Sequence, residues 1–385
     1  MRILILNSEY PPIGGGAGNA SACLAAELSN LGHEVKVVTS RFASLPKEEW
    51  VKTSKGQAYH LIRIPALRRN EERSNALEQG FFSLCAAWFG LPIVHSWKPN
   101  CVIAFFGVPC GLSALVWHLL LGTPYIISLR GGDVPGFRPY DFALYHRLVS
   151  PLLHIIYHRA TAVVANSAGL QQLAQAFDAS VPIDVIYNGV DTVQFHPVVG
   201  GERAFLQDET LQILFIGRVV YQKGLDILFS ALSELKAYSW HLTIVGDGPL
   251  RESLQLLAQQ LGIEERISYV GWVHREKLPF LYQQADLFVL PSRHEGMSNV
   301  VLEAMASGLA VIATDIAGNQ ELVVPGETGF LVPSNSSLEL RMALQNIMEN
   351  QQQLKDIGLA ARQRVEILFS WRSVAEQYVA LIEAK

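Results

Sequence analysis

The stretch Leu287–Ala313, LFVLPSRHEGMSNVVLEAMASGLAVIA, carries the pattern that decides the fold. It opens and closes with short apolar runs, at 287–290 and 311–313, and a polar loop and a segment with helical spacing lie between them. Short apolar runs that flank a helix are typical of the buried parallel strands of a βαβ unit. The stretch therefore predicts one repeat of a doubly wound α/β domain.

The same alternation runs through the first half of the chain. Apolar runs predict strands at 3–6, 35–39, 61–64, 102–106, 125–129, 162–165 and 183–187. The predicted helices alternate with them, at 17–31, 75–97, 109–121, 140–158 and 169–177. Residues 1–190 are therefore expected to form one Rossmann-like, doubly wound domain.

Asn-Gly, His-Pro and Gly-Gly signals between residues 188 and 211 interrupt the pattern and predict a hinge. The alternation then restarts, with strands expected at 213–216, 242–245, 267–270, 287–290 and 311–313 and helices at 225–236, 250–261, 276–283, 300–307 and 338–349. Residues 191–368 are the second expected Rossmann-like domain. A final amphipathic helix, 371–383, has no strand after it, so we expect residues 369–385 to pack back on the N-terminal domain.

Open parallel sheets bind their ligands outside the carboxyl ends of the strands. If two such domains face each other, these ends line a common cleft. The cleft between the domains is therefore the expected active site.

The composition narrows the class of protein. The chain has 385 residues, of which 50% are hydrophobic and 17% charged, and its formal net charge is −5. This length predicts two domains, and so high an apolar content excludes a mainly disordered chain. The small net charge gives no support for nucleic-acid binding through phosphate neutralisation.

The four cysteines lie in apolar stretches of the first half and form no C-x-x-C pair: Cys23, Cys85, Cys101 and Cys110. This pattern favours buried, reduced thiols over a disulfide or a metal site, and so a reducing, cytoplasmic compartment. The N-terminus turns polar too early for a signal peptide. Residues 101–121 lack formal charges over the length of a membrane span, but Gly107, Pro109 and Gly111 interrupt them and favour a strand followed by a helix.

A glycine-rich loop, Gly14-Gly15-Gly16-Ala17-Gly18, follows the first predicted strand and opens a helix. Glycines let a ligand approach the backbone, and a helix N-terminus favours an anion. The spacing is not G-x-G-x-x-G directly after the strand, and the second strand ends in Ser40-Arg41 without an acid for a ribose. A dinucleotide site and a flexible turn with no ligand both remain open at this point.

Arg218 and Lys223 stand five residues apart between a predicted strand and helix of the second domain. At the carboxyl end of a strand, these cations are placed to bind a diphosphate, the Arg through forked hydrogen bonds and the Lys as a point charge. The alternative is two solvated surface cations.

Two carboxylates lie in the stretch 287–313. Glu295 falls in the loop, where it would accept hydrogen bonds from sugar hydroxyls, and Glu303 falls on the following helix, where it would take a ribose diol. A carboxylate within so apolar a helix requires a partner. The free amides of the first helical turn would point at the ligand and favour phosphate.

These residues closely resemble glycosyltransferase family 4 of the GT-B fold. The resemblance rests on Glu295-x7-Glu303 with Gly296 and Leu302-Glu303-Ala304-Met305-Ala306, and it covers nearly the whole chain. Further matches are Gly217-Arg218 with Lys223-Gly224, Gly246-Asp247-Gly248-Pro249, Asn188-Gly189-Val190-Asp191, Gly318 with Glu321, Gly326-x-x-Gly329 and Phe369-Ser370-Trp371. The family implies a retaining transfer of a sugar from a UDP- or GDP-sugar to an acceptor hydroxyl.

The resemblance also implies roles for particular residues. Arg218 and Lys223 would hold the donor diphosphate, Glu295 the donor sugar and Glu303 the ribose. The remaining implied donor contacts are Gly217, Gly296, Met297, the amides of Ser298, Asn299 and Val300, Trp272 and Val273 against the base, and Gly15 and Gly16 from the first domain. The sequence has no D-x-D pair, so no metal and no other cofactor is expected.

One position departs from the family pattern. Where the family often has His-Gly-x-Asp after the strand at 125–129, this chain reads Arg130-Gly131-Gly132-Asp133. Arginine carries a fixed positive charge and lacks the acceptor nitrogen of a neutral imidazole. Arg130 and Asp133 are kept as expected catalytic residues, and Arg130 is expected to bind an anionic group of the acceptor.

The acceptor is expected to be a glycan or a lipid-linked molecule of cell-envelope, polysaccharide or glycolipid synthesis. A cationic and aromatic region, formed by Arg63, Arg68, Arg69, Arg73, Phe81, Phe82, Trp88 and Phe89, suggests peripheral contact with the inner face of a membrane. A solvated loop before a packed helix is the alternative. Competing functions are an epimerase or hydrolase of nucleotide sugars with the same fold, an NAD(P)-dependent oxidoreductase and a non-catalytic binding protein.

Overall fold

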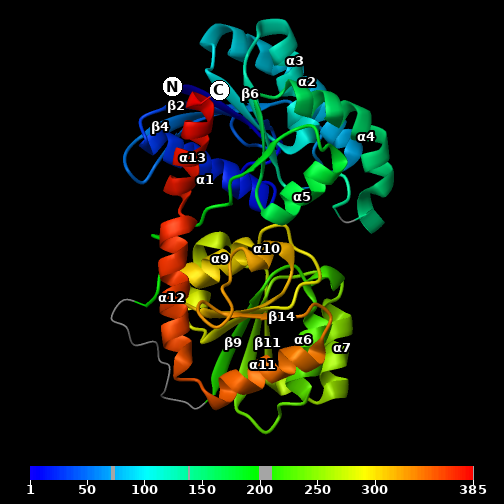
Figure 1. The fold of residues 1–385 in the computed structure, drawn as a ribbon, viewed down its shortest axis with the longest axis vertical. Coiled ribbons are helices and arrows are strands. Elements are labelled where there is room, and N and C mark those ends of the chain that lie inside the picture. Colours follow the sequence, from blue (N-terminus) through cyan, green and yellow to red (C-terminus); the bar gives the residue numbers. More distant parts are fainter. Residues whose placement is uncertain (71–73, 138, 199–209, 385) are drawn as a thin grey trace. The chain divides into compact units, whose positions relative to one another are not determined.

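The computed structural model describes residues 1–70, 74–137, 139–198 and 210–384. These residues form two compact units. Unit 1 comprises Met1–Gly189 and Trp371–Lys385, and unit 2 comprises Val190–Ser370. Each unit is built around its own, mainly parallel β-sheet with helices on both faces (Figure 1).

The unit 1 sheet has eight strands in the order β3-β4-β2-β1-β5-β6-β7-β8. The order reverses between β1 and β5, so the loops that follow these two strands lie at the switch point, where doubly wound sheets bind ligands. The strands are β1 Arg2–Leu6, β2 Glu34–Ser40, β3 Glu48–Lys52, β4 Ala58–Ile64, β5 Cys101–Phe105, β6 Tyr125–Leu129, β7 Ala162–Ala165 and β8 Ile183–Val185.

All seven strands expected in the first half are present, and β3 is an addition that the sequence analysis missed. It pairs antiparallel with β4 at the edge of the sheet. Three of its five residues, EEWVK, are charged and none of the five is buried, so it lacks the apolar run by which the other strands are recognised.

Two layers of helices cover the unit 1 sheet. Side chains alternate across each strand, so Ile3 and Ile5 face α1 and α13 while Leu4 and Leu6 face the layer that contains α2 to α5. The helices are α1 Gly16–Asn30, α2 Ala76–Trp97, α3 Leu112–Leu121, α4 Pro139–Arg159, α5 Ala168–Phe177 and α13 Trp371–Glu383.

The last helix of the chain belongs to the first unit. Figure 1 shows α13 (red) beside α1 (blue), and α13 buries Trp371, Val374 and Tyr378 against that side of the sheet. The Tyr378 hydroxyl lies 2.8 Å from the Ser128 hydroxyl of β6. Apolar packing and a buried hydrogen bond therefore join the C-terminal segment to unit 1.

The helix expected at 109–121 is present, and its first turn is irregular. An irregular turn spans Phe106–Gly111, with Phe106 at a φ of +73°, and α3 begins only at Leu112. Residues 101–121 thus divide into a buried strand, a turn and a helix, as the glycines and Pro109 indicate. Among the described helices, α2 is long and apolar enough to cross a membrane, and 33% of its most apolar window is buried.

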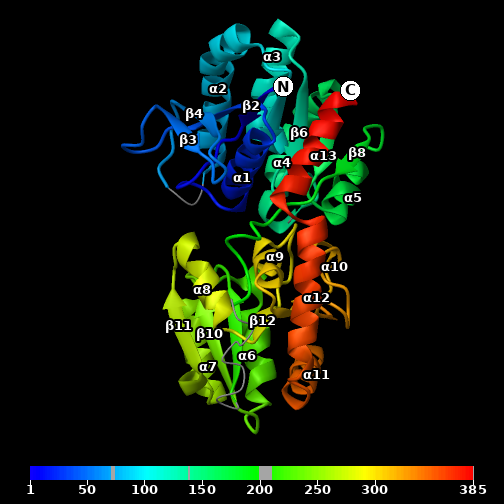
Figure 2. The same cartoon turned by 90° about the vertical axis from the view of Figure 1, so that its left-hand side faces the viewer.

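The unit 2 sheet is entirely parallel, in the order β11-β10-β9-β12-β13-β14. Its strands are β9 Leu211–Ile216, β10 Trp240–Val245, β11 Ile267–Gly271, β12 Leu287–Leu290, β13 Ala310–Thr314 and β14 Phe330–Val332. The helices are α6 Leu225–Ser233, α7 Arg251–Leu261, α8 Leu278–Gln283, α9 Asn299–Ala306, α10 Ala317–Gln320, α11 Ser337–Glu349 and α12 Gln353–Leu368 (Figure 2).

Three elements of unit 2 were not predicted. β14 and α10 have only three and four residues, too few to show a period. The third element, α12, is longer. It packs closely on the segment between α9 and β13, since a Cβ on Gly358 would lie 2.1 Å from the Gly308 carbonyl oxygen. The predicted helix at 225–236 also ends early, at Ser233.

Candidate active site

Glycines allow the loops after β9 and β10 to contact each other closely at the carboxyl edge of the unit 2 sheet. A Cβ on Gly246 would lie 2.0 Å from the carbonyl oxygen of Gly217, and a Cβ on Gly248 would lie 2.4 Å from that of Val219. The Val219 amide also donates to the Asp247 carbonyl at 2.9 Å. The loops after β9 and β10 therefore touch through their backbones, and no side chain fits between them.

Lys223 and Glu295 form the central ion pair of this edge. The Lys223 Nζ lies 2.5 Å from the Glu295 Oε1, and only 13% and 10% of the two side chains are exposed. The Ser292 hydroxyl donates to the same carboxylate oxygen at 2.7 Å. The structure thus brings together two residues, 72 positions apart, that were predicted separately.

A second set of hydrogen bonds fixes the loop after β9, which carries Lys223, against the loop after β12, which carries Glu295. Arg293, which is buried, donates to the Tyr221 carbonyl at 2.5 Å and to both carboxylate oxygens of Asp226 at 3.0 and 2.7 Å. Its guanidinium also covers the Tyr221 ring at 3.8 Å. The Gln222 side chain donates to the His294 carbonyl at 2.6 Å. These contacts position Lys223 and Glu295, and none of the five residues that make them stood out in the sequence.

The loop before α9 supplies amides at the start of a helix. Ser298 is the N-cap residue of α9, and its side chain makes no capping bond. Within the described residues its buried hydroxyl has no hydrogen-bond partner. A Cβ on Gly318 would lie 1.9 Å from the Gly296 carbonyl oxygen, so α10, which follows β13, fixes the loop after β12. Met297 is buried beside them, and Asn299 and Val300, in the first turn, are half-buried.

Glu303 is buried on α9 with only 3% of its surface exposed. An acid in an apolar helix requires a partner, and Glu303 has two. The Arg275 guanidinium lies 2.8 Å from Oε1, and the Tyr282 hydroxyl donates to Oε2 at 3.1 Å. Burial raises the pKa of Glu303, and the neighbouring Arg275 and Tyr282 oppose that rise. Each carboxylate oxygen retains a lone pair for a ligand hydroxyl.

The remaining predicted donor residues lie at the ends of strands. Gly217 and Arg218 follow β9, and the Arg218 side chain is exposed. Trp272 follows the edge strand β11 with 61% of its surface exposed, and its ring stands edge-on to His274 with centroids 4.3 Å apart. Val273 beside it is half-buried. The edge thus combines a solvent-facing cation with a solvent-facing indole.

In unit 1, Asp133 is buried and organises the loop after β6. Its Oδ1 accepts the backbone N–H groups of Arg130 and Gly131 at 3.0 and 3.1 Å, and its Oδ2 accepts that of Gly107, after β5, at 2.8 Å. Burial raises the pKa of Asp133, and these N–H bonds oppose the rise. Asp133 therefore joins two loops at the carboxyl edge and acts as a positioning residue.

Arg130 is half-buried next to this loop. Its guanidinium lies 4.1 Å from the centre of the Phe105 ring, and one of its N–H groups donates to the Asn188 side chain. Burial lowers the pKa of Arg130, while Tyr378 and Asp133 favour the charged form. Among the described residues, its buried Nε has no hydrogen-bond partner.

The glycine loop after β1 faces a carboxylate. Gly15 is the N-cap residue of α1, Gly16 is the first residue of that helix, and the Gly15 amide donates to Glu9 Oε2 at 3.4 Å. The Glu9 Oε1 lies 3.8 Å from the Arg68 guanidinium. An acid of the chain itself thus stands where an anionic ligand was expected.

The predicted cationic patch needs correction. Arg63 is buried against Glu49, at 2.5 Å, and the Arg68 side chain is 3% exposed, so neither presents its charge to a surface. Phe82 is buried and Phe81 half-buried, because α2 turns them into the core. Arg69, Trp88 and Phe89 are exposed, whereas Arg73 lies outside the described residues. Four large apolar side chains of α2 do reach the surface: Leu77, Leu84, Trp88 and Phe89.

Comparison with known proteins agrees with this architecture. Residues 202–364 match the family described as glycosyl transferases group 1, and residues 14–194 match glycosyltransferase family 4. A relative in Mycolicibacterium smegmatis, a GDP-mannose-dependent alpha-(1-6)-phosphatidylinositol monomannoside mannosyltransferase, is 26% identical over 100% of this chain and 98% of its own.

Solved structures share the fold over the full chain. Sucrose-phosphate synthase from Thermosynechococcus elongatus has a TM-score of 0.82 at 22% identity, covering 100% of both chains. HepE from Anabaena, in complex with UDP and glucose, has a TM-score of 0.76 at 20% identity, again over 100% of both chains. The two family matches together span most of the sequence and the fold agrees with them, so the chain belongs to the family 4 glycosyltransferases of the GT-B fold, which act on nucleotide sugars.

Proposed function

We propose that this enzyme transfers a sugar, with retention of configuration and without a metal, from a UDP- or GDP-sugar to a hydroxyl of a glycan or lipid-linked acceptor. The observation that carries the proposal is the Lys223–Glu295 pair, held between two interlocked loops at the carboxyl edge of the unit 2 sheet. It sets a cation for phosphate beside a carboxylate for sugar hydroxyls. We expect the product to belong to cell-envelope, polysaccharide or glycolipid synthesis.

The chemical difficulty is the negative charge that grows on the departing diphosphate. Arg218, Lys223 and the amides at the start of α9 would stabilise that charge, because preorganised donors need no rearrangement as it develops. The buried Ser298 hydroxyl adds a further donor at this helix end. Loss of one such donor typically costs about 10²–10³ in rate.

The ion pair also sets how the donor would enter. Lys223 would turn from Glu295 toward the diphosphate, which frees carboxylate lone pairs for hydroxyls of the sugar. Glu303 would accept a ribose hydroxyl while Arg275 and Tyr282 keep its carboxylate in place. Trp272, exposed at the edge strand, would lie against the base.

Retention is proposed to proceed on the front face, with the leaving phosphate assisting the acceptor hydroxyl. The sequence offers no convincing carboxylate nucleophile, and Asp133 already accepts three backbone N–H bonds. This step rests on analogy with the family, since a fold hosts many chemistries.

A membrane-bound acceptor fits the outer surface of unit 1. Helices α2, α3 and α4 pack side by side in sequence order (Figure 1), and their exposed faces are rich in large apolar side chains. These are Leu77, Leu84, Trp88, Phe89, Leu119, Leu120, Leu144, Leu148 and Ile155. Arg147 and Arg159 are exposed on α4, so the surface suits an anionic bilayer.

Vesicle binding tests this surface. Leu84→Gln with Trp88→Gln should abolish co-sedimentation with phosphatidylglycerol vesicles at low salt. Trp50→Gln is the matched control, because Trp50 is equally exposed but lies on β3. Binding that survives the double substitution would remove α2 from the membrane contact.

The donor site is tested first by thermal stability in EDTA with UDP, GDP, ADP, their sugar conjugates and NAD(P). A ligand at about 100 times its Kd adds roughly 2.7 kcal/mol, which raises the midpoint by about 5–10 °C. A shift with one nucleotide diphosphate, lost in Arg218→Ala, supports the metal-independent donor site. A shift with NAD(P) alone would support the oxidoreductase alternative.

An epimerase or hydrolase of the same fold would release nucleotide without an acceptor. Release that requires an acceptor distinguishes transfer from both. Substitution of Arg130 tests the acceptor: Arg130→Ala should raise the acceptor KM far more than the donor KM if its cation binds an anionic group there.

A further inference from the structure

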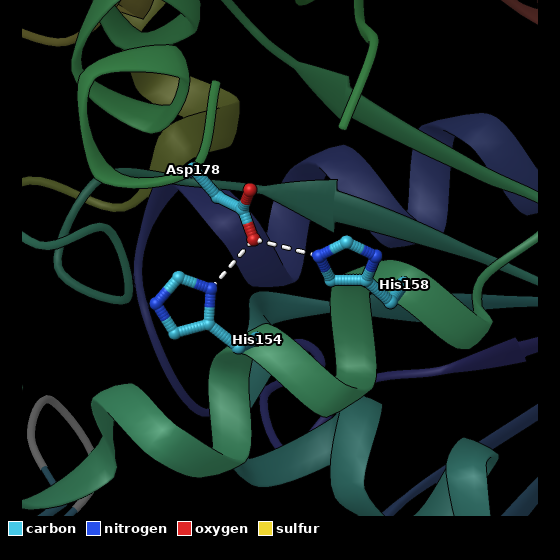
Figure 3. Close-up of side chains that lie close together, drawn as sticks. All are labelled: His154, His158 and Asp178. Carbon is cyan, nitrogen blue, oxygen red and sulfur yellow. Dashed lines mark hydrogen bonds and ion pairs between the residues drawn. The ribbon is translucent and has the colours of Figure 1, made fainter. Parts of the chain in front are cut away.

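Two histidines at the C-terminal end of α4 meet an aspartate that follows α5, apart from the candidate active-site residues. The His154 Nδ1 lies 2.6 Å and the His158 Nε2 3.1 Å from the same oxygen, Oδ2 of Asp178 (Figure 3). The three candidate ligand atoms lie within 4.8 Å of one another. Histidines four residues apart share one face of a helix, and both rings in Figure 3 turn toward the carboxylate.

The carboxylate is held by groups other than the histidines. Asp178 ends α5 and is buried, with only 6% of its side chain exposed. Its other oxygen, Oδ1, accepts the Ser180 hydroxyl at 2.6 Å and the Ser180 amide at 3.2 Å. The His154 ring stacks on Phe177 with centroids 4.3 Å apart. Asp178 and His154 are therefore oriented by neighbours, which leaves Oδ2 and the imidazoles to face one another.

We propose that His154, His158 and Asp178 form a binding site for a divalent transition metal of the zinc class. Two nitrogens and one carboxylate oxygen favour Zn²⁺, Co²⁺ or Ni²⁺ over Mg²⁺ or Ca²⁺, which prefer all-oxygen sites. Ligand atoms around tetrahedral zinc are roughly 3.3 Å apart, given bonds of about 2.0 Å. The His154 and His158 N–O distances, 2.6 and 3.1 Å, are about 0.7 and 0.2 Å shorter than this, so the His154 ring in particular has to rotate away from Oδ2 to admit the ion.

Because His154 and His158 are partly exposed, water would occupy the fourth coordination position of the metal. The His154 and His158 side chains are 46% and 52% exposed, whereas Asp178 is buried beneath them. An ion would therefore enter from solvent and need no opening of the core. Three protein ligands with water in the fourth position are a known zinc arrangement.

The place of the cluster in the fold argues for a structural role. α4 ends at Arg159 just before β7 begins at Ala162, and Asp178 precedes β8. Both points lie at the amino edge of the parallel sheet, opposite the carboxyl edge where ligands of such sheets bind. The metal would fasten the last turn of α4 to the loop after α5 and so stabilise unit 1.

The test uses the full chain, stripped with EDTA, dialysed and titrated with ZnCl₂ while calorimetry and the unfolding midpoint are recorded. One Zn²⁺ per chain is expected, and zinc at about 100 times its Kd should raise the midpoint by roughly 5–10 °C. CoCl₂ should give the visible absorption of four-coordinate Co²⁺. MgCl₂ should give neither signal.

Matched variants decide whether the signal comes from this cluster. His154→Gln and His158→Gln change exposed side chains and should each weaken zinc binding at least tenfold, whereas His95→Gln, exposed on α2, should bind as the wild type does. Wild-type affinity in both α4 variants, or no saturable binding by the wild type, would overturn the proposal. The readout is metal binding, so the result is independent of whether the enzyme transfers a sugar.

Discussion

In unit 2 the carboxyl edge of the sheet presents charge and aromatic surface to solvent, through Arg218 and Trp272, whereas in unit 1 three arginines are paired within the fold and the outer helices present leucines and a tryptophan. Arg63 pairs with Glu49, Arg68 lies near Glu9, and Arg130 donates to Asn188. The difference teaches that a high density of charged residues in the sequence does not by itself predict a charged surface, because the arginines of such a segment can pair with acids inside the fold. The position of a charged residue at a strand end, next to a glycine, selected residues of the unit 2 edge, whereas the density of charge selected Arg63 and Arg68, whose side chains are buried.

The largest expected effect is a loss of activity when Lys223 of unit 2 is replaced. Lys223→Met should lower kcat/KM by about 10²–10³, because it removes a preorganised cation from the leaving diphosphate. Steady-state kinetics measure the loss. Lys355→Met, exposed on α12, is the matched control and should remain within twofold of the wild type. Equal kinetics in both variants would leave Lys223 a structural partner of Glu295.

The second effect concerns the buried loop of unit 1. Asp133→Asn sets an amide against the Gly107 N–H and replaces an acceptor by a donor, which should cost about 2–3 kcal/mol of unfolding free energy. Thermal melting should show a fall of roughly 5–10 °C. Asp184→Asn, exposed on β8, is the control. A melting point that stays unchanged would mean that Asp133 does not position these loops.

The third effect is the contribution of the Arg275–Glu303 ion pair to the stability of unit 2. Arg275→Ala leaves Glu303 buried without its cation and should cost about 2 kcal/mol, less than a fully buried pair because Arg275 is 31% exposed. Since burial already raises the pKa of Glu303, Glu303→Gln should restore much of the loss in the double variant. Chemical denaturation of the three variants measures this. An additive double variant would show that the two side chains do not interact.

The smallest effect is a pH dependence in unit 1. The pKa of Asp178 is about 2, below its ordinary value of 3.8, so the stability it contributes is present above pH 4 and is lost as the pH falls toward 2. His154→Gln removes one of its bonds and should reduce that contribution by about 1 kcal/mol. Acid unfolding in EDTA, compared with His95→Gln, measures the difference. Identical acid midpoints would contradict it.

Much of the fold was predictable because long apolar periods are local signals. Every strand expected in both halves is present, and the elements that were missed were mostly short or charged, such as β3 with its exposed Glu48 and Lys52. The glycine motifs were visible in the sequence, but the sequence did not show why glycine is required at these positions. Gly246 and Gly318 are required because carbonyl oxygens of distant loops lie 2.0 and 1.9 Å from where a Cβ would stand.

The candidate site was predictable residue by residue but not as a set of contacts. Lys223, Glu295 and Glu303 were chosen from their spacing, whereas Arg293, Tyr282 and Arg275 carry no comparable local signal. The histidines of α4 did carry one, the interval of four residues, but their aspartate lies twenty residues further on.

The sequence by itself determined the alternating α/β pattern, the family and the candidate residues for a donor site, because strand periods, turn glycines and motif spacing are local features of neighbouring positions. Only the tertiary structure decided which of those charges meet. It paired Lys223 with Glu295 and turned Arg63 and Arg68 inward, and it brought Asp178 to the two histidines of α4. The physical reason is that burial and electrostatic pairing depend on distances in space, and the packing of strands and helices sets those distances.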